Sequence, residues 1–222
     1  MRRVVDDETV ERIAELSEFN GSYVVLMATA GVLSAIALLT NSVPVLIGSM
    51  IIAPALSPLA LVAIGLANRE RALVVDGAMS ATLGLCISMA AAVVITAFLN
   101  AVHVLPSEMA LLDRALLQER VSPGWYSVVT ATAAGIAGMI ALRDGKTDTL
   151  VGVVAALALV PAAVAGAIAF LSEDPISGWG GIALLGINVF LIVVSGVATL
   201  FFLQPQEERA DGPIARRKDI QA

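Results

Sequence analysis

Six long apolar runs, separated by short segments that carry most of the charges, dominate the pattern of this chain. The runs cover residues 22–40, 43–67, 75–99, 125–142, 149–171 and 180–203. A helix needs about 20 apolar residues to cross the roughly 30 Å hydrocarbon core of a bilayer. Helices also satisfy their own backbone hydrogen bonds, as that core demands. The pattern therefore predicts an all-α, polytopic membrane bundle of six spans, with the lipid bilayer as its surroundings.

Three segments flank or interrupt this membrane domain, residues 22–203. Residues 1–21 place a short apolar stripe on one face of a helix, which predicts an amphipathic cytoplasmic helix on the membrane or on the bundle. Residues 100–124 predict a helical linker along the outer surface, with Ser107 as its N-cap. Residues 204–222 form a polar tail. The two apolar faces consist of Val10, Ile13 and Ala14, and of Met109, Leu112, Ala115 and Leu116.

The distribution of Lys and Arg predicts the direction of the spans. Cytoplasmic loops carry an excess of these residues near the ends of membrane helices. The face that holds both termini has 11 of the 13 basic residues, and the opposite face has only Arg114 and Arg120. We therefore expect a multi-pass protein of the cell (plasma) membrane with both termini in the cytoplasm. The cytoplasmic set comprises Arg2, Arg3, Arg12, Arg69, Arg71, Arg143, Lys146, Arg209, Arg216, Arg217 and Lys218.

Composition argues against several classes of function. The net charge of −6 comes without a basic patch that would neutralise phosphates, so we expect no nucleic-acid partner. The single histidine, His103, lies just beyond the third span and away from the mid-span serines, so the sequence lacks a hydrolase constellation. It also lacks a cluster of metal ligands within the spans. We expect no enzyme, no metal and no cofactor, and we expect Cys86 to be a small buried apolar residue.

The chain matches itself at an offset of 104 residues. Residues 28–50 and 132–154 share seven identities in 23 positions, over two consecutive spans and the loop between them. Each copy, about 22–99 and 125–203, holds three spans. An odd number of spans inverts the second copy in the membrane, which is an arrangement common in transporters. The alternative is that helices rich in Ala, Gly and Leu resemble one another by composition alone.

Prolines near the middle of the second span predict a broken helix. Pro54 removes the hydrogen bond to the Met50 carbonyl, and Pro58 removes the bond to the carbonyl of Pro54. In hydrocarbon a neighbour, a water or a ligand must satisfy such carbonyls. Pro161 lies one residue from the position equivalent to Pro58, so we expect the fifth span to be broken at a similar depth. The predicted midplane site comprises Ser49, Met50, Pro54, Ser57, Pro58 and Pro161; the alternative is a packing kink.

Two polar residues mark the sixth span. Asn188 and Ser195 are seven residues apart and therefore share one face of a helix. They either line a polar path or hydrogen-bond to a neighbouring helix. Both are included among the candidate residues of a substrate or ion path.

The stretch around the two prolines also resembles a known family. The block LIGSMIIAPALSPLALVAIGLA, residues 46–67, is followed by a short charged turn. It is similar to the signature of the domain of unknown function 389 family of bacterial and archaeal membrane proteins. The resemblance is clearest over residues 43–73 and extends by hydropathy over about 22–171. It implies a bundle of several spans and brings no established activity with it.

Two functions from different classes fit these features. The repeat and the broken helices favour a transporter or channel for a small cation or neutral solute, because carbonyls and hydroxyls coordinate hard cations without a fixed charge. Alternatively, the protein is a non-transporting scaffold or accessory subunit, since small residues allow helices to pack closely within or between subunits. These small residues also predict a homo-oligomer, a dimer or trimer. They are Gly31, Ser34, Gly135 and Gly138.

Overall fold

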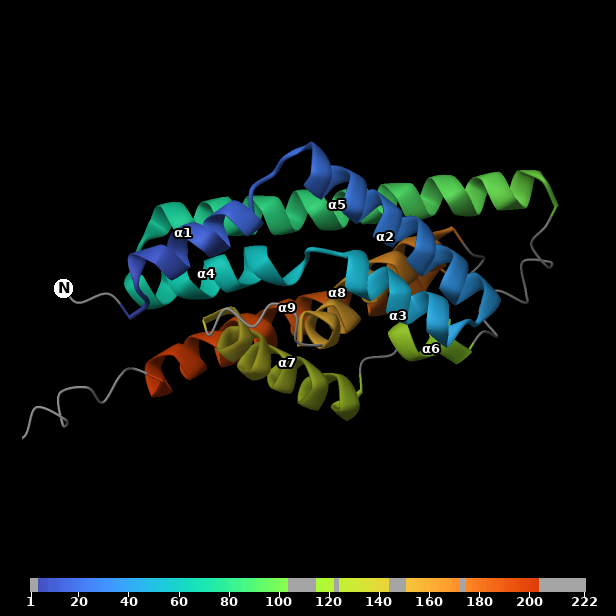
Figure 1. The fold of residues 1–222 in the computed structure, drawn as a ribbon. Helices are drawn as coiled ribbons and strands as arrows, with labels where there is room; N and C mark the ends of the chain where they lie inside the picture. Colours follow the sequence, from blue (N-terminus) through green and yellow to red (C-terminus); the bar gives the residue numbers. More distant parts are fainter. Residues whose placement is uncertain (1–3, 104–114, 122–123, 144–150, 172–174, 204–222) are drawn as a thin grey trace, which may run out of the picture.

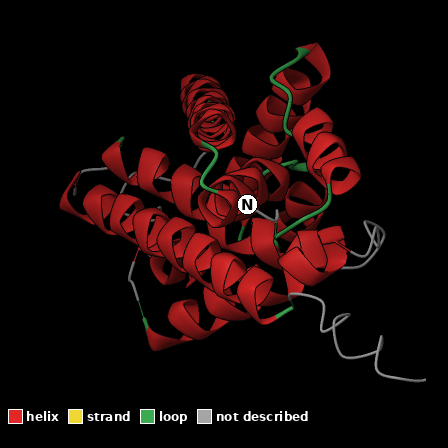
Figure 2. Cartoon of the chain, turned by 90° about the vertical axis from the view of Figure 1, so that its left-hand side faces the viewer, coloured by secondary structure: helices red, strands yellow, loops and turns green. Residues whose placement is uncertain are grey.

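Every secondary-structure element in the described part of the chain is a helix (Figures 1 and 2). The computed structural model describes residues 4–103, 115–121, 124–143, 151–171 and 175–203, with the backbone alone for 151–158 and 175–177. These ranges form nine helices: α1 Asp7–Leu16, α2 Gly21–Thr40, α3 Val43–Ile52, α4 Leu56–Asn68, α5 Arg71–Ala101, α6 Ala115–Val121, α7 Trp125–Arg143, α8 Val151–Phe170 and α9 Pro175–Phe202.

Helix length and composition make this a multi-pass integral membrane protein. Four helices, namely α2, α5, α7 and the part of α9 from Gly178 onward, are long and apolar enough to cross a bilayer. A fifth span results if α3 and α4, which are bent by 51° at a short break, are counted together. The predicted fifth span, residues 149–171, coincides with α8, whose apolar stretch within the residues searched is the shorter Leu159–Phe170.

Two helices, α4 and α8, form the centre of the bundle. Between them they contact every other described helix. Ala60 and Ile64 of α4 are fully buried, as are Val160 and Val164 of α8. Alanine is the most frequent residue of the hydrophobic core, so the surrounding helices approach closely and the dispersion contacts of the core are dense. The prolines of the predicted site therefore lie on or beside the two central helices.

The N-terminal helix α1 lies against the bundle. The side chain of Asp6 caps it by accepting a hydrogen bond from the Thr9 N–H at 3.0 Å. Val10 and Ile13 are buried, and the helix packs chiefly against α4. Ser17 extends the apolar stripe because its hydroxyl donates to the Ile13 carbonyl at 2.6 Å, which satisfies the group in its buried position.

Helix α6 is the described part of the predicted linker helix. It contacts α8 and α9, and its buried residue is Leu117, with an exposed fraction of 1%. We predicted the apolar face one residue earlier, through Ala115 and Leu116. Ala115 is exposed and Leu116 is half-buried, so that prediction of the face was wrong. The reason is tertiary, since the Leu116 N–H donates to Asn41 Oδ1 at 3.1 Å and fixes the rotation of this short helix. Met109 and Leu112 lie outside the described residues.

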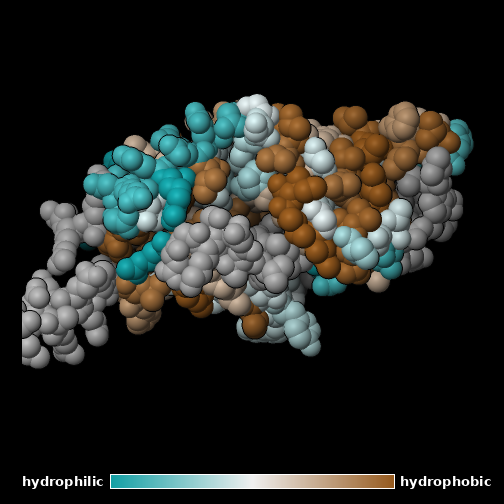
Figure 3. All heavy atoms as spheres, viewed as in Figure 1, coloured by the Kyte–Doolittle hydropathy of each residue, from teal (hydrophilic) through white to brown (hydrophobic). Residues whose placement is uncertain are grey.

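The surface divides into a polar end and an apolar body. Hydrophilic residues gather over α1 and the adjoining ends of α4 and α5, whereas hydrophobic residues cover α2, α3 and the second half of α5 (Figure 3). Exposed apolar side chains such as Val94 and Phe98 on α5 fit contact with lipid. Cys86 of α5 is exposed, contrary to our expectation, because in a membrane the outer face of a helix is as apolar as its core.

Candidate functional site

The second span is broken at Pro54, as predicted. Helix α3 ends at Ile52 and α4 begins at Leu56, with the 51° bend between them. Ala53 is extended, with φ −72° and ψ 117°, and this is the conformation that a following proline imposes. Ala55 is the N-cap residue of α4 and makes no side-chain capping bond. The sequence thus encodes the break locally, through the ring of Pro54.

Pro58 has a different role from the one predicted. It is the third residue of α4 and so lies in the first turn, where an N–H group has no partner within the helix. A proline is tolerated in this turn without disrupting the hydrogen bonds that follow. The span therefore has one interruption, at Pro54, rather than two.

The break leaves backbone polar groups open in an apolar span. The last carbonyls of α3 and the first N–H groups of α4 have no partner within their own helices. Among the described residues, no hydrogen bond joins the backbone of residues 50–57 to another segment. In hydrocarbon each such group would cost several kcal/mol. A site of this kind favours an occupant that donates hydrogen bonds to the carbonyl oxygens or is coordinated by them. Water, a cation and a polar solute meet this requirement.

The side chains at the break differ in burial. Met50 and Pro58 are buried, whereas Pro54 and Ser57 are half-buried and form its accessible side. The Ser57 hydroxyl makes no hydrogen bond to another described residue. Its hydroxyl and the open carbonyls are therefore the polar groups that the break offers to a ligand.

Ser49 belongs to a helix interface rather than to the break. It is fully buried, and its hydroxyl donates to the Leu46 carbonyl at 2.7 Å. The same oxygen lies 3.5 Å from the Ser34 hydroxyl of α2. The two serines thus join α3 to α2, and the contact could not be predicted from α3 alone.

Helix α8, the predicted fifth span, is continuous, contrary to the prediction that it is broken. Helix α8 runs from Val151 to Phe170 through Pro161, which is buried inside it. The position 104 residues after Pro54 is Ala158, so the proline that breaks the first copy has no counterpart in the second. A single internal proline removes one hydrogen bond, and helices packed on all sides can hold such a helix together.

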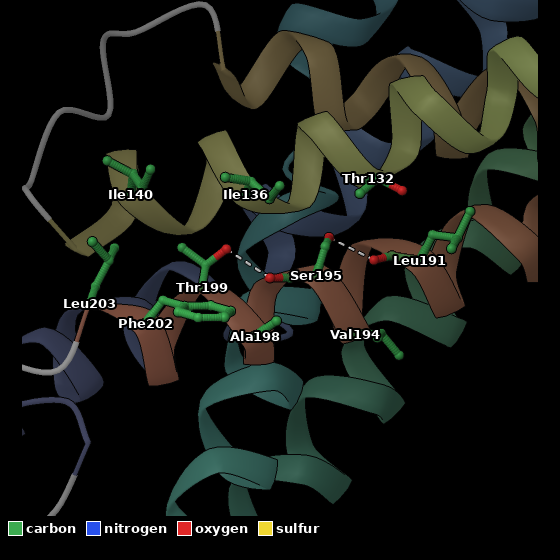
Figure 4. A pocket seen from close by; sticks show the side chains of 10 residues that line it. All are labelled: Thr132, Ile136, Ile140, Leu191, Val194, Ser195, Ala198, Thr199, Phe202 and Leu203. Carbon is green, nitrogen blue, oxygen red and sulfur yellow. Dashed lines mark hydrogen bonds between the residues drawn. The ribbon is translucent and has the colours of Figure 1, made fainter.

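The two polar residues of the predicted sixth span are both buried. Asn188 and Ser195 lie on α9, with exposed fractions of 2% and 8%. The Ser195 hydroxyl donates to the Leu191 carbonyl of its own helix at 2.7 Å, instead of to a neighbouring helix. Ser195 lines a groove of about 460 Å³ between α7 and α9, together with Thr132 and Thr199 (Figure 4). Neither threonine was among the predicted site residues.

A second, smaller cavity of about 260 Å³ lies between the C-terminal end of α1 and helices α4 and α5. It is lined by residues from the end of α1 and from α4 and α5, including the carboxylates Glu18 and Asp76 and the hydroxyl residues Ser17 and Ser80. Asp76 lies in the second turn of α5. Its place in this cavity next to α1 depends on tertiary packing and was not predictable from hydropathy.

Glycines bring the outer helices together at positions that recur at the predicted offset. A Cβ on Gly31 of α2 would clash with the backbone of Ser88 in α5. A Cβ on Gly135 of α7 would lie 2.6 Å from the carbonyl oxygen of Ile192 in α9. Both members of the second pair follow those of the first by 104 residues. The same sequence offset therefore relates the packing of α2 on α5 to that of α7 on α9.

The central helices follow the same offset. A Cβ on Gly77 of α5 would lie 2.5 Å from the carbonyl oxygen of Pro58 in α4. A Cβ on Gly181 of α9 would lie 3.2 Å from the carbonyl oxygen of Ala162 in α8. Again each residue of the second pair is 104 positions after its counterpart. Packing of α4 on α5 thus resembles packing of α8 on α9.

The comparisons with known proteins point to one family. No curated protein and no solved structure matches the chain. The family model described as Domain of unknown function (DUF389) matches residues 50–194, which run from the end of α3 into α9. This range contains the break and reaches beyond the stretch on which the resemblance first rested. It covers more than half of the chain, and the protein therefore belongs to the DUF389 family.

Proposed function

We propose that the protein moves a small cation or small neutral solute across the membrane, as a transporter or channel, at the break between α3 and α4. The observation that carries this proposal is the set of open backbone groups around Pro54 within an apolar span. Irregular backbone at membrane depth is tolerated where it is buried in protein or lines a water-filled cavity. Carbonyl oxygens and the Ser57 hydroxyl suit a hard cation or a polar solute better than an anion.

We infer that six spans form two inverted copies, with α2 to α5 as the first and α7 to α9 as the second. In this arrangement α8 is the fifth span, equivalent to the α3–α4 pair. The four glycine contacts related by 104 residues support the copies. Helix α4 of the first copy packs against α9 of the second, and α8 of the second copy packs against α5 of the first. These reciprocal contacts support a two-fold axis between the copies. Substrate sites of inverted-repeat transporters lie between the copies near the midplane.

We also propose that both termini face the cytoplasm of a cell in whose plasma membrane the protein lies. Hydrogen bonds gather the segments with the most basic residues at one end of the bundle. The Val4 N–H donates to Asn68 Oδ1 at 2.9 Å, and the Arg12 guanidinium donates to the Leu142 carbonyl at 2.6 Å. Arg143 donates to the Leu203 carbonyl. This end carries the excess of Lys and Arg that marks a cytoplasmic face.

A second candidate function, a non-transporting scaffold or accessory subunit, is favoured by the packing around the break. Met50 and Pro58 are buried, and the Ser49 and Ser195 hydroxyls are satisfied within the protein. A scaffold needs a partner surface, and we propose a homo-oligomer, a dimer or trimer, that forms through the apolar outer faces. Native mass spectrometry in mild detergent would detect it.

Flux of cations and small neutral solutes into liposomes that contain the pure protein tests the proposal. We expect flux above that of empty liposomes. Pro54→Ala should lower it because the ladder of hydrogen bonds can then close over the open carbonyls. Ser57→Ala should lower it while changing the stability by less than about 0.6 kcal/mol, the average for one interhelical hydrogen bond in a membrane bundle, because the Ser57 hydroxyl makes no such bond within the described residues. The matched control is Pro44→Ala, which changes an exposed proline in the first turn of α3, away from the break.

The scaffold predicts a different set of results. Flux of the unmodified protein would equal that of empty liposomes for every ion and solute tried. Equal flux in folded Pro54→Ala, Ser57→Ala and Pro44→Ala would contradict a site at the break even if the protein transports. A melting curve for each variant separates these outcomes from misfolding.

A further inference from the structure

The groove between α7 and α9 has a chemistry that the break does not use. We propose that it binds one acyl chain of an anionic phospholipid, and that the phosphate of this lipid is held by Arg143. The groove opens on the outer surface of the bundle, and about 460 Å³ is within the range of roughly 300–1,000 Å³ typical of ligand pockets. This site is independent of transport, so a failure of either proposal leaves the other standing.

The groove has an apolar lining, although three of its residues carry hydroxyl groups. Each hydroxyl donates to a carbonyl of its own helix: Thr132 to Val128 at 2.8 Å, Ser195 to Leu191 at 2.7 Å and Thr199 to Ser195 at 2.7 Å. Figure 4 shows the latter two bonds as dashed lines from the hydroxyl oxygens to carbonyl oxygens of α9. The remaining lining residues are aliphatic or aromatic. The groove therefore offers no free donor to a solute and suits an apolar chain.

The length of the groove matches one leaflet of a bilayer. Along α9 it extends from Leu191 to Leu203, the residue that follows the last turn of the helix. These residues are 12 positions apart, which corresponds to about 18 Å at 1.5 Å per residue. The hydrocarbon core is about 30 Å thick, so this length runs from one membrane surface to slightly beyond the midplane. An acyl chain of a single phospholipid occupies the same depth.

The surface end of the groove carries positive charge. Arg143 is the last residue of α7, and its guanidinium donates to the carbonyl of Leu203, which lines the groove. Arg12 of α1 donates to the neighbouring carbonyl, that of Leu142. A guanidinium has five N–H donors, so Arg143 has donors left for a phosphate. The residues that line the groove include no carboxylate. Apolar groove and cationic mouth together match the two parts of an anionic phospholipid.

Native mass spectrometry of the purified full-length protein tests this site. Phosphatidylglycerol and phosphatidylcholine with identical acyl chains are titrated separately in mild detergent. We expect one phosphatidylglycerol to bind about fivefold more tightly than phosphatidylcholine, a factor that corresponds to one basic residue at a membrane surface. Arg143→Gln should remove this preference and retain binding of phosphatidylcholine. Arg71→Gln, at an exposed arginine of α5, is its control and should keep the preference.

Filling the groove is the second arm of the test. Ala198→Phe places a ring in the groove and should abolish the tightly bound lipid of either kind. The control is Val94→Phe on α5, because Val94 is exposed to lipid and precedes Ala198 by 104 residues. It should leave binding unchanged, and a melting curve confirms that both variants are folded.

Several results would overturn the proposal. Equal loss of bound lipid in Ala198→Phe and Val94→Phe would mean that lipid binds over the whole outer surface of the bundle and not at one specific site. Equal affinity of the unmodified protein for the two lipids would remove the role of Arg143. Displacement of the bound lipid by inorganic phosphate would assign the charge to a free ion. If Ala198→Phe converts an oligomer into a monomer and leaves lipid binding intact, the groove belongs to a second copy of the chain.

Discussion

Glycines set the closest approaches between helices in this bundle. At Gly135 an added Cβ would lie 2.6 Å from the Ile192 carbonyl, and the obstacle is backbone, which cannot rotate away. We expect Gly135→Ala to push α7 from α9 and to lower the stability by about 1–3 kcal/mol, as overpacking of a core does. Gly31→Ala should have a similar effect through Ser88. Thermal unfolding in detergent measures both.

The control for these variants is Gly186→Ala on α9. No atom lies within 4 Å of the position that its Cβ would occupy, and the residue is exposed. Alanine favours a helix by about 1 kcal/mol over glycine, so this variant should melt at the same temperature or higher. A fall as large as that for Gly135→Ala would show that close approach is not what the glycines provide.

Residue roles were predictable where the cause is covalent and local. The ring of Pro54 constrains Ala53 and itself, so the break follows from the sequence alone. The partner of Ser49 was not predictable, because Ser34 is on another helix. The exposure of Cys86 was not predictable either, since lipid-facing and buried positions of a membrane helix share one composition. Polarity therefore says little about which face of such a helix is inside.

At the level of elements, α1 depends on its N-terminal cap. The Thr9 N–H bond lowers the pKa of Asp6 below its usual 3.8. A carboxyl whose pKa is lower in the folded state stabilises the fold above the unfolded pKa and loses this effect as the pH falls through the folded value. We expect Asp6→Ala to destabilise α1 by about 1 kcal/mol at neutral pH. Hydrogen exchange of the α1 amides measures it.

The pH dependence distinguishes the cap from a general effect of charge. Asp6→Asn keeps a side-chain acceptor for the Thr9 N–H and cannot titrate. Its α1 should exchange at nearly the rate of the unmodified protein at pH 6 and should show no further opening as the pH is lowered below 4, after correction for intrinsic exchange. If the unmodified protein also shows no such opening, the capping bond makes no contribution in solution.

Elements were predicted best where a single physical signal decides them. Runs of about 20 apolar residues located α2, α5, α7 and α9, whose bounds differ from the prediction mainly at the ends. Helix α5 continues to Ala101 and begins at Arg71, because its ends project beyond the apolar run. The integrity of α8 was predicted wrongly. The effect of Pro161 depends on neighbours that hold the helix on both sides of the ring, and a single sequence does not name them.

At the level of the whole molecule, the arrangement of helices places α4 and α8 between the other elements. The offset of 104 residues was visible in the sequence, but composition alone offered an equally simple cause. The glycine contact Gly31–Ser88 recurs as Gly135–Ile192. This recurrence in space supports the internal repeat independently of sequence identity. Contacts between distant segments, such as α4 with α9, depend on the packing of the complete bundle.

The orientation of the molecule in the membrane gives the last prediction. The bonds of Val4, Arg12 and Arg143 join the N-terminus, the turn after α4 and the ends of α7 and α9. In the orientation that we propose, all four regions lie on one side of the membrane, and the excess of basic residues assigns that side to the cytoplasm. A cysteine at Gln118, an exposed residue of α6, should then react in intact cells with a reagent that does not cross the membrane. A cysteine at Arg71 should react only after the cells are opened. Both are introduced with Cys86→Ala, because Cys86 is exposed on α5.

Reaction at position 71 in intact cells, with none at 118, would reverse the proposed orientation and leave the helix bundle unchanged. Reaction at both positions would mean that the two ends of the bundle are not separated by a bilayer.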